Sequence, residues 1–269
     1  MRPRSILLLI VVFLTAWGAL LAQKPWREYQ ARGAYTEVPP DYDVPHEWVT
    51  ARLMYRGGGG GFFGRRGRGR SSWATDYPAA DRHLIEGLRR LSRIDVRSVE
   101  QPVEMDGSDD PYNWPFLYAV EVGRWDFSED EAKQLREFID RGGFLMVDDF
   151  HGSYEWEDFM YGLTKVFPDK EVEDIPPDDH IMHMLSDVDQ SIQVAGIVAL
   201  RGGVTYERDG ITPHWRAIYD EKDRIVVAIC HNMDLGDAWE WSDDPNYPAD
   251  MAGVAHRILV NYAAYDLTH

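Results

Sequence analysis

The sequence predicts one α/β domain over residues 47–269, and three observations lead to that prediction. An apolar run at 115–122, a helical pattern and a second apolar run at 144–147 follow one another with short joints. A strand, a helix and a strand so joined are typical of a parallel βαβ unit. The 269 residues, 44% of them hydrophobic and 13% aromatic, are enough to bury a core and exclude a mainly disordered chain. No internal repeat or shift in composition divides this region further.

The first half of the domain is predicted to alternate strands with helices. Apolar density or alternation indicates strands at residues 48–55, 96–99, 115–122 and 144–147. Apolar side chains at helical spacing predict a helix over 79–93. Ser128 and Glu131 have the spacing of a capping box and open a second helix, which Gly142 and Gly143 end.

The second half has a more interrupted pattern. We expect a helix at 153–167, an acidic loop at 169–179, a strand at 192–200, an antiparallel hairpin of 215–219 with 224–229, and a closing helix at 251–265. Between the first strand and the first helix, residues 57–70 hold five consecutive glycines and then four arginines. We interpret this Gly/Arg-rich segment as a solvated insertion loop, with contact to an anionic lipid or polymer as the alternative.

The N-terminal residues predict export from the cytoplasm. Arg2 and Arg4 precede an apolar run at 6–22, which is the pattern of a secretory signal. The run is slightly shorter than the roughly 20 residues of a comfortable membrane span. Residues 1–22 are therefore either a cleaved signal peptide or an N-terminal membrane anchor, and both place the domain in the periplasm or facing the extracytoplasmic side. The proline-containing residues 23–46 are expected to form a linker.

Charge and cysteine content exclude several classes of protein. The chain has 28 Lys+Arg against 46 Asp+Glu, a formal net charge of −18, and a surface this acidic repels nucleic acid. The single cysteine, Cys230, excludes an internal disulfide framework and a multi-cysteine zinc site. Since Cys230 lies in an apolar run, we interpret it as a small buried strand residue.

Candidate site residues follow two predicted strands. Asp148 and Asp149 come directly after the apolar run at 144–147, and Asp234 and Asp237 follow the hairpin. Ligands gather at the carboxyl ends of strands in open α/β sheets, and carboxylates suit Mg²⁺ or Ca²⁺. The alternative is that Asp148 and Asp149 only cap the following segment. If no pair of these carboxyl groups comes within about 5 Å, they cannot share a cation at ordinary bond lengths.

An ordered series of short segments resembles the bacterial domain of unknown function 4159 family over about residues 47–265. The series is Ala51-Arg52-Leu53-Met54-Tyr55, Trp73 to Ala80, Trp114 to Tyr118, Leu135-Arg136, Gly142 to Asp149, Asn232 to Trp239, and Asn261-Tyr262. Its most specific element is Gly-Gly-Phe-Leu-x-x-Asp-Asp at 142–149.

The resemblance implies a flavodoxin-like three-layer sandwich with a mostly parallel sheet, similar to class I glutamine amidotransferases. The family has no assigned reaction. The amidotransferase activity is not carried over, because the turn at Asp148 and Asp149 has no thiol where such enzymes place their nucleophile.

We therefore expect a non-catalytic binding or scaffolding domain of the bacterial cell envelope. Its pocket is expected to involve Asp148, Asp149 and Asp234, with Tyr55, Trp73 and Asp76 nearby. It would bind an envelope protein and would need no cofactor. If the N-terminal segment is not cleaved, that segment would also attach the domain to the membrane. The alternative is a metal-assisted hydrolase in which Asp148, Asp149 and Asp234 hold a divalent cation, acting on an envelope glycan or another small substrate.

Overall fold

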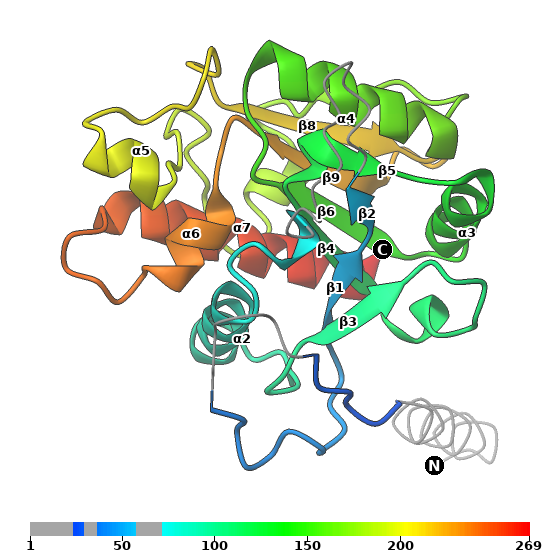
Figure 1. The fold of residues 1–269 in the computed structure, drawn as a ribbon. Coiled ribbons are helices and arrows are strands. Elements are labelled where there is room, and N and C mark those ends of the chain that lie inside the picture. The colour runs from blue at the N-terminus through cyan, green and yellow to red at the C-terminus, as the bar shows by residue number, and fades with distance from the viewer. Residues whose placement is uncertain (1–23, 30–36, 58–71) are drawn as a thin grey trace, which may run out of the picture.

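The computed structural model describes residues 24–29, 37–57 and 72–269, and a mixed seven-stranded sheet runs through them (Figure 1). The strands lie in the order β3-β1-β4-β6-β9-β8-β7. In chain order they are β1 (Thr50–Met54), β3 (Gln101–Glu104), β4 (Phe116–Val120), β6 (Phe144–Asp148), β7 (Glu173–Asp174), β8 (His214–Tyr219) and β9 (Ile225–His231). The first five strands of the order pair in parallel, whereas β8 is antiparallel to both of its neighbours.

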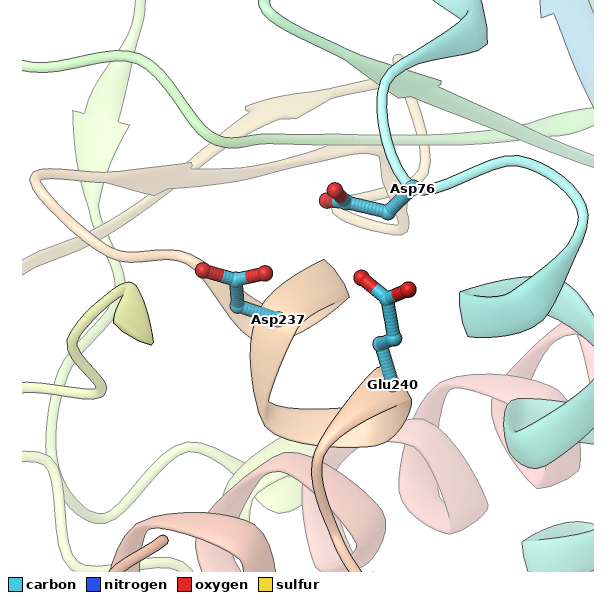
Figure 2. Close-up of side chains that lie close together, drawn as sticks. All are labelled: Asp76, Asp237 and Glu240. Atoms are coloured by element: carbon cyan, nitrogen blue, oxygen red, sulfur yellow. The ribbon is translucent and has the colours of Figure 1, made fainter. Parts of the chain in front are cut away.

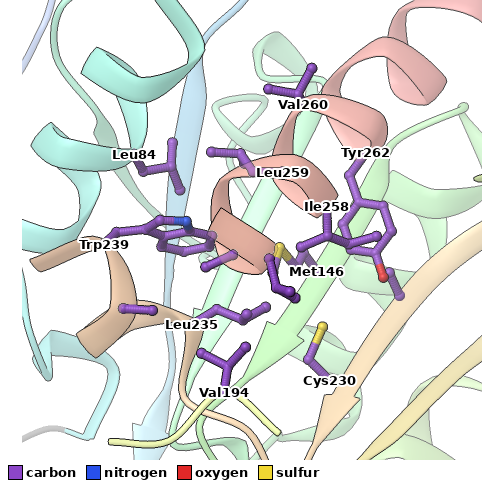
Figure 3. Packing of buried hydrophobic residues seen from close by; sticks show 14 of the residues in the cluster. Leu84, Met146, Val194, Cys230, Leu235, Trp239, Ile258, Leu259, Val260 and Tyr262 are labelled. Carbon is purple, nitrogen blue, oxygen red and sulfur yellow. The ribbon is translucent and has the colours of Figure 1, made fainter. Parts of the chain in front are cut away.

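Helices cover both faces of the sheet, so the domain has three layers (Figure 1). One face packs against α2 (Ala79–Leu91), α6 (Leu235–Glu240) and α7 (Ala249–Thr268). The other packs against α3 (Glu129–Asp140) and α4 (Gly152–Val166). Strand residues alternate between the two cores, as on β4, where Tyr118 joins the first and Leu117 the second. Figure 3 shows the first core, in which Cys230 and Tyr262 lie among apolar side chains.

Smaller elements fill the connections. They are the two-stranded pair β2 (Arg56–Gly57) and β5 (Trp125–Asp126), the short helix α5 (Ile197–Arg201), and the 3₁₀ helices η1 (Ser72–Ala74), η2 (Pro111–Asn113), η3 (Val122–Arg124) and η4 (His180–Met182).

Most of the predicted elements are confirmed to within a few residues. The capping box at α3 is present: Glu131 N–H donates to Ser128 Oγ, and Ser128 N–H donates to Glu131. The strand predicted at 96–99 is wrong, because that segment makes only an isolated bridge to Trp48, and β3 begins at Gln101. In the sequence, Pro102 argues against a strand at 101–104, because proline has no N–H to donate to a neighbouring strand. The structure tolerates Pro102 because β3 is at the edge of the sheet.

The strand predicted at 192–200 is also wrong. Residues 192–196 have no regular structure, and Ile197 begins α5 instead. Short apolar runs do not distinguish a strand from a buried coil or helix. The structure decides between them through a distant residue, since the Asp237 carboxylate accepts a hydrogen bond of 2.7 Å from the Ile197 N–H in the first turn of α5.

The predictions for residues 1–22 and for the loop at 57–70 lie almost entirely outside the described residues. Within the predicted linker, the described parts contact the domain: Lys24 pairs with Asp110 at 3.1 Å, and Asp41 pairs with Arg89 at 2.8 Å. Across residues 24–29, 37–57 and 72–269, no helix combines the length and the apolar character that crossing a bilayer requires.

A fully buried ion pair joins β1 to α2. Arg52 and Asp81 are both 0% exposed, and Arg52 Nη2 lies 2.5 Å from Asp81 Oδ2. The guanidinium also donates at 3.5 Å to the carbonyl groups of Trp73 and Thr75, and it lies 4.5 Å from the centre of the Tyr118 ring. Arg52 therefore holds the loop before α2 in place against the sheet.

Replacing Arg52 by methionine is expected to lower the free energy of unfolding by about 3–5 kcal/mol, because Asp81 is left buried without a partner. Urea unfolding of the purified protein measures this loss. Arg141→Ala is the matched control, since Arg141 and Glu137 form an exposed pair and should contribute less than about 1 kcal/mol. The double variant R52M/D81L should recover most of the loss; a double variant as unstable as R52M would contradict this account.

Candidate carboxylate site

The ends of β6 and β9 are joined beyond the last paired strand residues. Asp149 N–H donates to the Met233 carbonyl at 3.2 Å, and Asn232 N–H donates to the Phe150 carbonyl at 3.0 Å. These bonds place Asp149, which follows β6, next to Asp234, which caps α6. Asp76 reaches the same edge from the loop between η1 and α2.

Asp148 is the innermost carboxylate and is 0% exposed. Its Oδ2 accepts hydrogen bonds from the N–H groups of Leu235 (2.7 Å) and Gly236 (3.1 Å) and from the Tyr118 hydroxyl (3.2 Å). Its Oδ1 is buried and has no hydrogen-bond partner among the residues that the structure describes. Burial, with the charge of Asp149, raises the pKa of Asp148 to about 8 in spite of these donors. Asp148 thus holds the start of α6 with one carboxylate oxygen, while its other oxygen is left without a hydrogen bond from the described residues.

Two groups of three carboxylates lie beside Asp148. In the first, Asp76, Asp149 and Asp234 each offer an oxygen within 4.8 Å of the others. In the second, Asp76, Asp237 and Glu240 do the same (Figure 2). Asp76 belongs to both groups. The requirement that carboxyl oxygens lie within about 5 Å of one another to share a cation is therefore met by Asp149 and Asp234.

These carboxylates are largely withdrawn from water and repel one another. Burial raises the pKa of Asp76 and Asp234 well above the usual value, and Asp149 and Asp237 add to the shift. The pKa values of Asp237 and Glu240 are raised as well, first by burial. None of the five pairs with a lysine or arginine among the residues that the structure describes. The site is thus a concentration of negative charge without a cation of its own.

Two glycines, Gly196 and Gly236, lie so close to the carboxylate oxygens that a side chain at either position would contact them. A Cβ atom at Gly196 would lie 2.6 Å from Asp234 Oδ2 and 3.2 Å from Asp237 Oδ2. A Cβ atom at Gly236 would lie 3.0 Å from Asp76 Oδ2. Real Cβ contacts are almost never that short, so a larger residue at Gly196 would displace the carboxylates.

A mixed group of charges adjoins Asp149 on its other side. Glu155 is 3% exposed and pairs with Arg208 and, at 3.5 Å, with Arg124, while the His151 N–H donates to it at 2.7 Å. Burial and the charge of Asp149 raise the pKa of Glu121, the residue after β4, to about 7. The site therefore has an anionic side and a side where two arginines are exposed.

His151 links the two sides through Asp149. Its Nε2 lies 3.3 Å from Asp149 Oδ1, and its Nδ1 is buried without a hydrogen-bond partner in the described part of the chain. Burial alone would lower the pKa of this imidazole, but the hydrogen bond and charge of Asp149 outweigh it, and the pKa is raised.

The residues predicted from the sequence divide into two sets. The structure brings together four of the predicted carboxylates, Asp76, Asp149, Asp234 and Asp237. Asp148 belongs to neither group and instead accepts from the first N–H of α6, next to Asp234. Tyr55 and Trp73 make their side-chain contacts outside the two groups: the Tyr55 hydroxyl donates to the Val120 carbonyl at 2.5 Å, and the Trp73 ring packs against Tyr77. Burial, with the charges of Glu121 and Asp149, raises the pKa of Tyr55, so this side chain lies close enough to the site to interact with Asp149. Sequence reasoning missed Glu240, whose signal is its spacing of three residues from Asp237 on a helix too short to predict. It also missed Glu121 and Glu155, for which we find no sequence signal.

Cys230 has none of the features of a nucleophile. It is 0% exposed, and burial, with the charge of Asp148, raises the pKa of its thiol well above the usual value. A thiol held protonated inside the core is unreactive.

The metal-free protein should become less stable as pH rises from about 5 to 8. Asp148 titrates near 4 when unfolded and about 8 when folded, so the folded state binds more protons across this window. Thermal melting in EDTA at several pH values measures the slope. Asp148→Asn keeps an oxygen that accepts from the Leu235 and Gly236 N–H groups. This variant should reduce the slope of stability against pH and should be more stable than the wild type at pH 8. Glu157→Gln, at an exposed carboxylate of α4, should leave the slope unchanged; equal slopes in both variants would contradict the assignment.

Comparison with known proteins gives a family but no activity. No curated protein matches the chain. The family model described as "Domain of unknown function (DUF4159)" matches residues 52–267, which include the last three residues of β1, every carboxylate of the two groups and nearly all of α7. The chain therefore belongs to the domain of unknown function 4159 family.

Proposed function

We propose that this protein is a divalent-cation-binding domain. The observation that carries the proposal is the convergence of Asp76, Asp149 and Asp234, whose oxygens come within 4.8 Å of one another from three separate segments of the chain. Asp149 and Asp234 are 8% and 5% exposed, and within residues 24–29, 37–57 and 72–269 neither pairs with lysine or arginine, although Asp149 contacts His151. Buried carboxylates normally have a partner, and a cation supplies one here.

The chemistry of the donors favours a hard cation. All members of both groups are carboxylates, without histidine or cysteine, which is the oxygen-only donor set that suits Mg²⁺, Mn²⁺ or Ca²⁺ rather than Zn²⁺ or copper. A bound dication would also favour the charged forms of Asp76 and Asp234, and so would lower their raised pKa values.

We also propose that the fold is flavodoxin-like and similar to that of class I glutamine amidotransferases. The carboxylate site lies where such a fold binds its ligands. The five parallel strands, numbered along the chain, lie in the order 2-1-3-4-5, which is the flavodoxin-like order. Ligands of such sheets bind outside the carboxyl ends of the strands, where these carboxylates lie.

We further propose that the domain works outside the cytoplasm as a binding or scaffolding module of the cell envelope. Support for export comes from Arg2, Arg4 and the apolar run at 6–22. Calcium-binding modules outside cells commonly work at cation concentrations of about 0.1–1 mM. In this proposal the cation orders the edge of the sheet to which an envelope partner binds.

A saturating divalent cation should raise the melting temperature of EDTA-treated protein. Binding to the folded state alone stabilises it by about 2.7 kcal/mol at a hundred times the dissociation constant. Melting curves with Mg²⁺, Mn²⁺ and Ca²⁺ measure the shift. Asp234→Asn should abolish most of it while retaining the helix cap, since asparagine also caps helices.

Asp187→Asn is the control for that experiment and should respond to the cations as the wild type does. Asp187 is exposed, and it pairs with His183 rather than with a member of the two carboxylate groups. Unchanged melting temperatures with all three cations would exclude the proposed function.

A metal-assisted hydrolase is the second candidate, and the position of His151 favours it. His151 contacts Asp149 through Nε2 and has a free Nδ1, so it can transfer a proton beside a cation held by Asp149. Two exposed arginines, Arg124 and Arg208, adjoin the same side and suit an anionic substrate.

Chromogenic phosphate esters, carboxylic esters and glycosides, supplied with Mg²⁺ or Mn²⁺, test this second candidate. His151→Gln should lower kcat about 100-fold or more while changing cation affinity little, because general acid–base catalysis contributes about 10²–10⁴-fold. Wild-type rates no higher than those of Asp76→Asn on every substrate class would exclude the hydrolase and leave the binding module.

A further inference from the structure

We propose that the site holds two divalent cations bridged by Asp76. This inference rests on the proposed function and extends it from one ion to a binuclear centre. We call Asp76, Asp149 and Asp234 the inner group, and Asp76, Asp237 and Glu240 the outer group. Each group has its three oxygens within 4.8 Å of one another, and Asp76 is the member that they share.

The short helix α6 supplies both groups from one side. Asp234 caps it, Asp237 lies in its first turn and Glu240 is its last residue, so they follow one another at intervals of three residues. Residues three apart lie on the same side of a helix. Figure 2 shows Asp237 and Glu240 extending from this helix toward Asp76, which approaches from the opposite loop. Asp76 therefore faces the whole row rather than a single partner.

The charge of the five carboxylates exceeds what one dication neutralises. One ion would leave three formal negative charges in a site without lysine or arginine partners among the described residues, whereas two ions would leave one. Asp237 and Glu240 lie in the outer group, beyond the three ligands of an ion in the inner group, so a single ion would leave them repelling each other.

Two buried oxygens without partners point to ligands independently of the clustering. Asp76 Oδ2 is covered from solvent and accepts no hydrogen bond from any residue in the described ranges 24–29, 37–57 and 72–269. Asp148, 0% exposed, likewise has no partner for Oδ1, although its Oδ2 bonds to the two residues that directly follow Asp234. Buried polar atoms without partners are rare in folded proteins, and an unplaced ion is one of the few explanations for them.

Two glycines let the backbone come close to Asp76 and Asp234. Gly236 faces Asp76 Oδ2 and Gly196 faces Asp234 Oδ2, and in both places a methyl group would approach the oxygen to 3.0 Å or less. A carboxylate that gives one oxygen to each of two ions holds them about 3.5–4 Å apart, as in known two-metal sites. Asp76, shared by both groups, is the residue placed to do this.

Metal content is the direct test. The full-length protein, stripped with EDTA and dialysed against Mn²⁺, should bind two ions per chain by atomic emission. Its electron paramagnetic resonance spectrum should lack the simple six-line signal of isolated Mn²⁺, because ions that share a carboxylate are magnetically coupled. Glu240→Gln should bind one ion and restore the six-line signal, and Asp149→Asn should do the same by removing the other group.

Asp76→Asn should abolish the coupling and weaken both ions at least tenfold, whereas Asp187→Asn should retain two coupled ions. Circular dichroism of each metal-free variant establishes that it folds, and the wild-type stoichiometry does not depend on any variant. One uncoupled ion per wild-type chain would overturn the binuclear centre and leave the proposed function intact. No bound ion would overturn both.

Discussion

The buried guanidinium of Arg52 is the interaction on which the site depends. It neutralises Asp81 on α2, holds the carbonyl groups of the loop that leads to Asp76, and lies over the ring of Tyr118. Tyr118 in turn donates to Asp148, and Asp148 accepts from the first peptide groups of α6. A single chain of contacts therefore runs from β1 through β4 and β6 to the helix that carries Asp237 and Glu240. Because every member is buried, each position constrains the next.

Backbone strain is concentrated at the same edge of the sheet. Asp76, Asp149 and Asn232 have φ values of 58°, 56° and 63°, in the left-handed region that most residues avoid. Asp and Asn tolerate this conformation better than other residues do, because their short side chains can bond locally. Such strain costs about 1–3 kcal/mol per residue and persists where surrounding contacts over-determine it. Here it turns the chain sharply after β6 and β9, so that carboxylates from different strands face one another.

The parallel core could be predicted from the sequence because its signals are local. The capping box at Ser128 and the apolar runs of β4, β6 and β9 identify the βαβ unit and the hairpin without knowledge of the fold. Asp148, Asp149 and Asp234 could be nominated because they directly follow strands. Other features depend on distant contacts: α5 begins where Asp237 accepts from Ile197, and β3 tolerates Pro102 only because it lies at the edge. Glu240 could not be assigned to the site from the sequence, because the six-residue helix α6 that carries it is too short to predict.

The carboxylates of the site come from the loop before α2, the end of β6 and the start of α6, which are far apart along the chain. With one cysteine, this protein has no covalent link between such segments. Ions held by Asp76, Asp149, Asp234 and Glu240, as proposed, would act as a reversible cross-link that closes long loops, as disulfides do in many secreted proteins. Resistance to proteolysis and the rate of unfolding would then follow the concentration of free divalent cation around the protein, and the domain would unfold slowly only where that concentration is high.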